Sequence, residues 1–298
     1  MLGVGHECLS RRRFRLHGDD EEDWDVEPGT FSPNARQLTP TGAAVLGEAV
    51  ACAGTVDGPP AITAFVGDVV PNDVTAVFAW QSGCRPRHMH ENYDERRRRE
   101  ATEIYIRGAY LLDPFFVASE GMTADCVRRL RDVQTDGFRQ TDYFRSYYVR
   151  TGLVDEISFY ARCENSSFLA VSIGRYSESS PFSQRDYNRA QFFLPVVAAL
   201  VRRQWGGEIA LEPAGDHRSG DGEAPPLPRL LAQEPFALLT TREREIVALM
   251  LRGHSSKSMG QVVGISTGTV KNHRKNIYRK LSVHSQSELF ARFLDVVG

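Results

Sequence analysis

The 298-residue sequence has no apolar run near the roughly 18 residues that a membrane span requires. We also expect no signal peptide, because the arginines at 11–13 are followed by an acidic stretch and not by an apolar core. The five cysteines lack the paired spacing of a metal site or disulfide framework: Cys8, Cys52, Cys84, Cys126 and Cys163. These absences predict a cytoplasmic protein with reduced thiols and no membrane partner.

The sequence also lacks a Gly-rich phosphate loop, a nucleophile elbow and a metal-protease helix. We therefore expect neither an enzyme nor a bound cofactor. A phospho-receiver domain is excluded, because Asp19 and Asp20 follow a segment too short and charged to be a buried parallel strand. Three potential soft-metal ligands, Cys84, His88 and His90, lie among arginines. That segment favours an exposed basic loop, and no metal site is expected.

Charge is divided unevenly along the chain. Residues 237–298 hold 10 Lys and Arg against 4 Asp and Glu, a net charge of +6. The remaining 236 residues hold 26 against 34, a net charge of −8. A basic module joined to an acidic one is typical of a DNA-binding protein whose other part must not adhere to DNA.

The basic module is patterned as four short helices. Polar residues and glycines stand where such helices begin and end: Thr240 with Glu243, Gly253, Ser255, Gly264, Ser266, and Ser285 with Glu288. Apolar residues at helical spacing predict the buried faces of the second and third helices: Met259, Val262, Val263, Val270, Ile277 and Leu281. This arrangement predicts a helix-turn-helix that places its third helix in the major groove of DNA.

Opposite the buried stripe of the third helix, polar and basic side chains point outward. Lys donates to guanine O6 and N7, and Asn pairs with adenine N6 and N7, so three residues are predicted to read bases: Lys271, Asn272 and Lys275. Four others suit contacts to the DNA backbone: Lys257, Thr269, Arg274 and Lys280. The alternative is that the helix only presents a solvated basic surface. This alternative does not explain the caps and the turn spacing around the helix.

Residues 239–289 resemble the DNA-binding domain of LuxR/FixJ-type transcription regulators. The matching elements are Leu239-Thr240, Arg242-Glu243, Gly253, Ser255, Lys257, Ile265-Ser266, Thr269-Val270-Lys271, His273, Ile277, Lys280-Leu281, Val283 and Glu288-Leu289. The resemblance implies that Lys271, Asn272 and Lys275 face bases and that the fourth helix serves dimerisation. The sequence departs from the family at 258–260, at Gly268 and at Ser282, and its helical glycines predict a slightly looser domain.

Upstream, residues 36–205 are expected to form an α+β sensor or dimerisation domain, between an arm at 1–35 that is expected to be disordered and a linker at 206–235. Strands are predicted over 61–66, 74–80, 156–161 and 168–174, with a loop over 85–92. Helices are predicted over 39–53, 94–112, 123–134, 139–151 and 183–204. The order describes an antiparallel sheet flanked by helices, which resembles GAF- or PAS-type sensors, followed by the all-α domain at 236–298.

Aromatic residues are dense in the helical middle of this domain. Small-molecule pockets are lined by aromatic side chains with a few polar groups. The candidates for such a pocket are Tyr105, Tyr110, Phe144 and Tyr147, with Asp113 and Asp155 as polar anchors. Alternatively, the rings form an ordinary core and the two aspartates end helices or turns. Tyr105, Tyr110 and Asp113-Pro114 also resemble acyl-homoserine-lactone binding domains, but the accompanying tryptophans are missing, so a lactone is not expected.

Together, the sequence predicts a transcription regulator that binds double-stranded DNA as a homodimer and contacts RNA polymerase. Two recognition helices would enter successive major grooves about 34 Å apart. The first domain is expected to sense a small molecule, whose identity the sequence does not reveal. The alternative is a ligand-free regulator whose first domain only dimerises or contacts polymerase.

Overall fold

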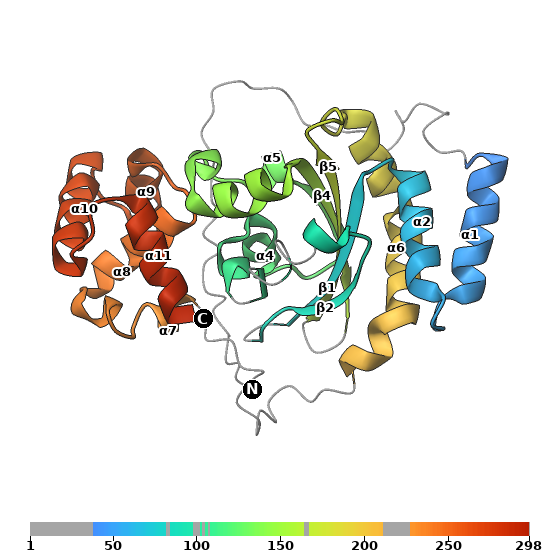
Figure 1. The fold of residues 1–298 in the computed structure, drawn as a ribbon, viewed down its shortest axis with the longest axis horizontal. Coiled ribbons are helices and arrows are strands. Elements are labelled where there is room, and N and C mark those ends of the chain that lie inside the picture. The colour runs from blue at the N-terminus through green and yellow to red at the C-terminus, as the bar shows by residue number, and fades with distance from the viewer. Residues whose placement is uncertain are drawn as a thin grey trace, which may run out of the picture.

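The computed structural model describes residues 38–81, 84–97, 102, 105–106, 108–163, 167–210 and 227–297. The arm predicted over 1–35 and residues 211–226 of the predicted linker lie outside these residues. Figure 1 shows a sheet covered by helices, joined at one end to a group of short helices near the C-terminus. None of the described helices is both long and apolar enough to cross a bilayer.

A five-stranded antiparallel sheet forms the centre of the first domain, in the order β2-β1-β5-β4-β3. The strands are β1 (Val74–Gln81), β2 (Arg87–Glu91), β3 (Cys126–Arg129), β4 (Leu153–Arg162) and β5 (Ser167–Tyr176). β5 pairs with β1 on one side and with β4 on the other. Side chains on both faces of β1 are buried, as expected for a strand that helices cover on both sides.

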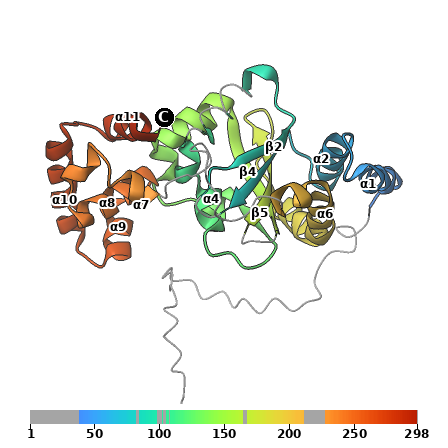
Figure 2. The same ribbon diagram turned by 90° about the horizontal axis from the view of Figure 1, so that it is seen from below.

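Two helices, α2 (Gly58–Val69) and α6 (Gln184–Ala210), cover one face of the sheet, and α1 (Pro40–Cys52) packs on the outer side of α2. Ile62, Phe65 and Val69 recur at helical spacing along α2 and are fully buried. The ring of Phe65 meets Phe193 of α6 edge-on, with centroids 6.2 Å apart. In Figure 2, α1 lies at the end of the molecule farthest from the C-terminal helices.

Short helical segments cover the opposite face, between the sheet and the C-terminal domain (Figure 1). They are η2 (Ala109–Leu112), α4 (Pro114–Ser119), α5 (Leu130–Val133), η3 (Phe138–Gln140) and the π-helix η4 (Phe144–Val149). Trp80 on β1 and Tyr160 on β4 point into this layer, with ring centroids 5.6 Å apart. The layer is therefore aromatic, whereas the opposite one is mainly aliphatic.

The C-terminal domain is helical. Its elements are α7 (Leu227–Leu230), η5 (Phe236–Leu238), α8 (Thr241–Leu251), α9 (Ser256–Val263), α10 (Thr267–Leu281) and α11 (Gln286–Val297). α7 lies within the predicted linker, but Leu227, Leu230 and Leu231 are buried in the core that contains α8. Residues 206–210 continue α6. Residues 206–210 of the predicted linker thus belong to α6, and residues 227–231 belong to the C-terminal domain.

Several sequence predictions for the first domain are confirmed: the helices over 39–53 and 183–204, and the strands over 74–80, 156–161 and 168–174. The prediction of a strand over 61–66 is wrong, because these residues belong to α2. Two prolines, Pro59 and Pro60, stand in the first turn of α2, where a missing N–H costs nothing. The alternation that suggested a strand is also compatible with the i, i+3, i+7 spacing of Ile62, Phe65 and Val69.

Four other predictions need correction. Residues 87–91 form the edge strand β2, not a loop; their polar, half-exposed side chains carry no apolar alternation. Residues 126–129 form β3 on the other edge, inside the segment predicted as a helix over 123–134. The predicted helix over 94–112 does not reach its end as an α-helix, because Gly108 adopts a φ of +146° and the 3₁₀ turn η2 follows. The predicted helix over 139–151 contains the π-helix η4.

Candidate DNA-binding surface and sensor core

Side-chain caps begin the helices of the C-terminal domain where the sequence predicts them. Thr240 and Glu243 form a capping box at the start of α8. The hydroxyl groups of Ser255 and Ser266 each accept a hydrogen bond from a backbone N–H in the first turn of α9 and α10, at 3.1 and 3.0 Å. Gly264 ends α9 with a φ of +70°, a conformation that favours glycine. These local contacts fix the turn between α9 and α10.

The third helix, α10, has the predicted division into two faces. Its inward face is fully or almost fully buried: Val270, Ile277 and Leu281. The three residues predicted to read bases are exposed: Lys271, Asn272 and Lys275. In both views α10 lies on the side of its domain that faces away from the sheet (Figures 1 and 2). The helix thus presents a polar surface that no other described element covers.

The residues predicted to contact the DNA backbone differ in how their side chains are held. Lys257 and Thr269 are exposed, near the starts of α9 and α10. Arg274 is half-buried and donates from its guanidinium to Oγ of Ser256 at 3.1 Å. This bond brings the start of α9 and the middle of α10 together, so a phosphate bound there would contact both helices.

Lys280 is tied to the interior of the domain. Its Nζ lies 2.7 Å from Oε2 of Glu243, a residue that is 4% exposed. Burial alone would raise the pKa of Glu243, but hydrogen bonds from Lys280 and Thr240 hold that pKa below its usual range. Lys280 therefore connects the end of α10 to the start of α8, a structural role that sequence analysis did not identify.

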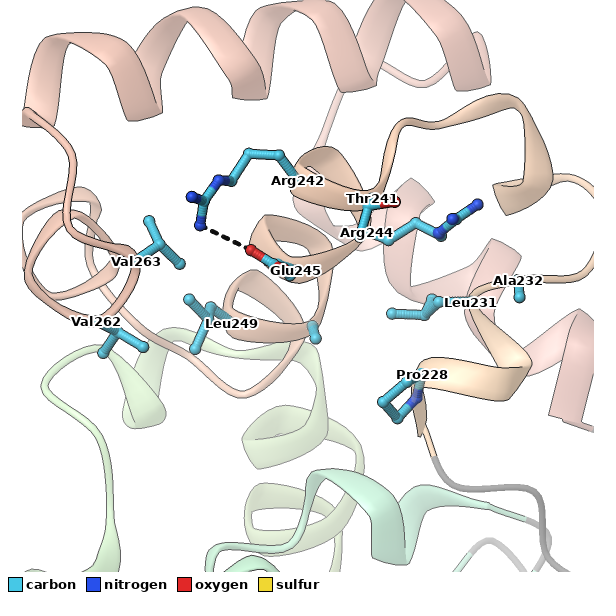
Figure 3. Close-up of a pocket in the computed structure, with 11 residues that line it drawn as sticks. Pro228, Leu231, Ala232, Thr241, Arg242, Arg244, Glu245, Leu249, Val262 and Val263 are labelled. Atoms are coloured by element: carbon cyan, nitrogen blue, oxygen red, sulfur yellow. Dashed lines mark hydrogen bonds and ion pairs between the residues drawn. The ribbon is translucent and has the colours of Figure 1, made fainter. Parts of the chain in front are cut away.

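The prediction that Val262 faces inward is wrong, because this side chain is 49% exposed. α9 has only eight residues, and Met259 and Gly260 are its buried positions. Val262 instead lines a groove of about 710 Å³ between α7, α8 and α9 (Figure 3). Figure 3 shows an ion pair at its edge, where Arg242 meets Glu245 at 2.8 Å. The remaining lining side chains are mostly apolar, and no sequence pattern marked this groove.

The candidate pocket residues of the first domain lie in the aromatic layer. Tyr105, Tyr110 and Tyr147 are buried, and the ring centroid of Tyr105 lies 6.3 Å from Tyr110 and 5.9 Å from Tyr147. Phe144 is half-buried and stacks on Tyr148 at 5.4 Å, which in turn meets Tyr147 at 5.4 Å. The structure thus brings three of the four candidates into direct contact and joins Phe144 to them through Tyr148.

Two carboxyl groups are buried in the same layer. Asp113 caps α4 and accepts a hydrogen bond from the hydroxyl of Tyr105 at 2.7 Å. Glu156 on β4 accepts one from the hydroxyl of Tyr148 at 2.7 Å. Burial raises the pKa of Asp113 to about 6, and burial together with the nearby Asp113 raises the pKa of Glu156 to about 8. Neither carboxyl group has a cationic partner among the described residues.

Sequence analysis identified Asp113 but not Glu156. A glutamate within an alternating strand pattern is ordinarily assigned to the exposed face, and only the helical layer over the sheet buries this one. Asp155, the other predicted anchor, serves a turn: its carboxylate accepts from the backbone N–H of Phe182 at 2.9 Å. Both aspartates thus agree with the alternative hypothesis, in which they stand at helix ends or turns. Asp113 also faces the aromatic layer.

The segment from Cys84 to His90 overlaps edge strand β2. Nε2 of His88 lies 3.0 Å from Oε2 of Glu91, and burial together with the neighbouring His88 lowers the pKa of His90. Among the residues that the structure describes, no three His, Cys, Asp or Glu side chains are grouped as metal ligands would be. His273 is half-buried on α10, beside the exposed Asn272.

Hydrogen bonds between described residues join the two domains. Three connect the sensor segment around η3 to the turn between α8 and α9: Thr135 Oγ1 to Arg252 O at 2.8 Å, Gly137 N to Gly253 O at 2.9 Å, and Ser255 N to Asp136 Oδ1 at 2.9 Å. A further one runs from Oγ of Ser287 on α11 to Oδ1 of Asp142 at 2.7 Å. The contact therefore involves the cap of α9, while α10 stays uncovered.

Comparison with known proteins finds matches in both domains. Residues 237–293 match the family "Bacterial regulatory proteins, luxR family". The HTH-type transcriptional regulator in the exeN 3′ region of Aeromonas salmonicida is 30% identical over 187 residues, which cover 61% of this chain and 93% of that protein. The monoamine regulon transcriptional regulator of Klebsiella aerogenes is 28% identical over 154 residues, which cover 52% of this chain and 56% of that protein.

A solved structure matches the first domain. The crystal structure of the VqsR LBD domain from Pseudomonas aeruginosa covers 59% of this chain and 100% of its own, with a TM-score of 0.50 and 21% sequence identity. At this identity the likeness concerns the fold alone. It agrees with the predicted antiparallel sheet flanked by helices, and the likeness to GAF or PAS domains stays a prediction.

Proposed function

Since the chain belongs to the luxR family of bacterial regulatory proteins and is thus a DNA-binding transcription regulator, we propose that a homodimer reads its operator with two copies of α10. One observation carries the proposal: the exposed cations of α10 have no acidic partner among the described residues, although other cations of the domain do. An uncompensated cationic surface is stabilised when it binds an anion such as the DNA backbone. The surface lies along one helix, which is the element that a major groove admits.

Within this interface the residues have distinct tasks. Lys271, Asn272 and Lys275 would contact base edges, because they lie on the outermost face of α10. Phosphate contacts would come from the rim: Lys257, Thr269, Arg274 and Lys280. Arg274 is held by Ser256 and Lys280 by Glu243, so these two side chains lose less freedom on binding than the exposed lysines.

The experiment is selection of bound sequences from a random duplex pool with the purified full chain. We expect an enriched motif with two inverted half-sites whose centres lie about one helical turn apart, the spacing of a twofold dimer. An enriched single half-site would contradict the dimer, and an unenriched pool would contradict sequence-specific reading. Lys271→Ala protein serves as the comparison, since its motif should change at one position of each half-site.

We further infer that the first domain binds a small molecule in the aromatic layer. The two buried carboxyl groups favour a ligand that carries a positive charge or several hydrogen-bond donors, because a cation would offset the cost of ionising Asp113 and Glu156. Aromatic rings around them suit the same class of ligand, through cation–π contacts. One relative is named for a monoamine regulon, which agrees with an amine.

Mass spectrometry of the intact full chain, before and after denaturation, tests whether the protein carries a small molecule. Thermal unfolding with a panel of amines, each paired with the alcohol of the same carbon skeleton, tests whether the ligand is an amine. A rise in the unfolding midpoint with amines alone supports the proposal. An equal response to both members of each pair would contradict a cationic ligand.

A ligand-free regulator is the second candidate function, and one observation favours it. The ring of Tyr105 contacts the rings of both Tyr110 and Tyr147, as it would in an ordinary core. In that case the first domain would serve dimerisation or contact with RNA polymerase. A protein that carries no extra mass and does not respond to any amine, yet forms a dimer, would support this candidate.

A further inference from the structure

We propose that the acidic segment Asp19–Glu27 of one copy of the chain docks on the basic outward face of α10 of a second copy and competes with DNA for it. This inference rests on the proposed role of α10 as the DNA-reading helix. The segment is a charge run that the proposed function leaves without a task.

The receiving surface is cationic and uncompensated. α10 holds five Lys and Arg residues and no Asp or Glu. Lys271, Lys275 and Arg279 on α10 are exposed, as is Lys257 on α9, and none of these forms an ion pair within the described part of the chain. By contrast, the cation nearest the end of α10, Lys280, is paired inside the domain. The outward face therefore attracts an extended polyanion.

The acidic segment has the charge spacing of such a polyanion. Seven of its nine residues are Asp or Glu, and it contains no Lys or Arg. An extended chain advances about 3.3–3.6 Å per residue. One strand of B-DNA carries a negative charge about every 3.4 Å. Measured along the DNA helix axis, the extended segment thus has a linear charge density close to that of one DNA strand, so a cationic face that accepts DNA can also attract this segment.

The length of the chain decides which α10 is reached. Ten residues separate Glu27 from Leu38, the first described residue, and they span at most about 40 Å. A domain of about 170 residues is itself roughly 40 Å across. Figure 1 places α1, which begins at Pro40, and α10 at opposite ends of the molecule, with the whole first domain between them. Asp19, at the far end of the segment, lies 19 residues from Leu38, at most about 70 Å along a fully extended chain. The segment could lie along its own α10 only if this chain ran fully extended around the first domain. The α10 of a second copy does not carry this constraint and is the proposed recipient.

Competition at one face has a defined signature. The bound segment and DNA exclude each other, so the segment lowers the affinity of the protein for operator DNA and for unrelated DNA by the same factor. It leaves the ratio of the two affinities unchanged. The effect fades as salt screens both interactions. A general change in net charge would also weaken DNA binding, and a matched control is needed to separate the two causes.

The test compares two full-chain variants with the same change of charge. One is the triple variant Asp20→Asn, Glu21→Gln and Glu22→Gln in the segment. Its control is Glu48→Gln, Asp57→Asn and Glu178→Gln, three exposed residues of the first domain. We expect the segment variant to bind both kinds of DNA about fivefold to tenfold more tightly at low salt, a size typical of coupled sites. Equal affinities in the two variants would overturn the proposal.

A second readout does not depend on DNA. A fluorescent peptide with the sequence of residues 19–27 is titrated with the segment variant, and its anisotropy is followed. We expect binding that Lys275→Ala weakens and that Val262→Asp, a change in the groove of Figure 3, leaves unaltered. The opposite pattern, or no binding, would overturn docking on α10. A protein that binds the peptide but fails to select DNA would contradict the proposed function and leave the docking intact.

Discussion

The backbone N–H of Gly137 donates to the carbonyl oxygen of Gly253 at 2.9 Å, and this bond crosses from the first domain to the second. Gly253 has a φ of +83° and ends α8, so the first domain holds the turn that begins the helix-turn-helix. Arg252 Nε and Gln134 Oε1 are buried nearby without a hydrogen-bond partner among the described residues. Unpaired buried polar atoms cost about 1–3 kcal/mol each, so these two atoms offset part of the stability that the hydrogen bonds across the contact provide.

Gly137→Ala tests the contact without straining the first domain. Gly137 has a φ of −111°, which alanine adopts readily, but the added Cβ would lie 2.6 Å from the carbonyl oxygen of Gly253. We expect the domains to separate, with a loss of about 1–3 kcal/mol from the stability of the docked state. Hydrogen exchange at the amides of 252–255 should accelerate. Gly47→Ala, whose Cβ would meet nothing within 4 Å, is the control and should leave that exchange unaltered.

Lys280→Ala should destabilise the C-terminal domain as well as weaken DNA binding. The substitution leaves the buried Glu243 without its cation, and loss of a hydrogen bond to a charged group costs about 1.5–3 kcal/mol. Because the pKa of Glu243 is held below its usual range, this contribution is present above the unfolded-state pKa and is lost as the solution becomes acidic. Urea unfolding measures it. Lys257→Ala, at an exposed site, should change stability by less than about 0.5 kcal/mol.

Base reading and phosphate binding predict different mutant behaviour. Lys271→Ala or Asn272→Ala should cost about 1–3 kcal/mol on the preferred operator and relax the preference at one base pair. Lys257→Ala should weaken all sequences about equally and reduce the dependence of affinity on salt by about one unit of slope. Titrations of operator and unrelated duplexes at several salt concentrations measure both effects. If the three variants behave alike on every sequence, the division into base and phosphate contacts is wrong.

The caps of α8, α9 and α10 could be predicted because each joins residues within four positions of one another, as with Ser266 and the N–H of Thr269. Residues 61–66 could not be assigned in the same way. Their apolar side chains fit a strand or a helix, and the packing of α2 on the sheet decides between them. Edge strand β2 could not be predicted for a related reason, since its pairing with β1 depends on backbone groups and its side chains are polar.

Contacts between distant parts of the sequence were the least predictable. The ion pair of Lys280 with Glu243 and the bond between Gly137 and Gly253 join residues whose neighbours in the sequence carry no matching signal. Glu156 belongs to the same group. Its burial depends on the helical layer that covers β4, and the period-two pattern of the strand does not reveal that layer.

The pH dependence of stability tests the buried carboxyl pair. The pKa of Glu156 is raised to about 8 in the folded protein, well above its value in the unfolded chain, so the folded state holds a proton that the unfolded state releases. This contribution to stability is complete below the unfolded-state pKa, near 4.5, and is lost as the pH rises through about 8. Asp113, with a pKa of about 6, also contributes stability that is lost as the pH rises, but over a lower pH range.

Urea unfolding of the full chain at pH 5, 6, 7 and 8 should therefore give a free energy of unfolding that falls with pH. Glu156→Gln keeps the hydrogen-bonding shape without the ionisation, so its curve should be flatter above pH 6, while Glu178→Gln at an exposed site should follow the parent protein. Tyr148→Phe removes the hydroxyl that donates to Glu156 and should steepen the loss at high pH, because ionised Glu156 would be left with less support. A parent curve that rises between pH 5 and 8, or a Glu156→Gln curve as steep as the parent's, would show that Glu156 is ionised in the folded protein.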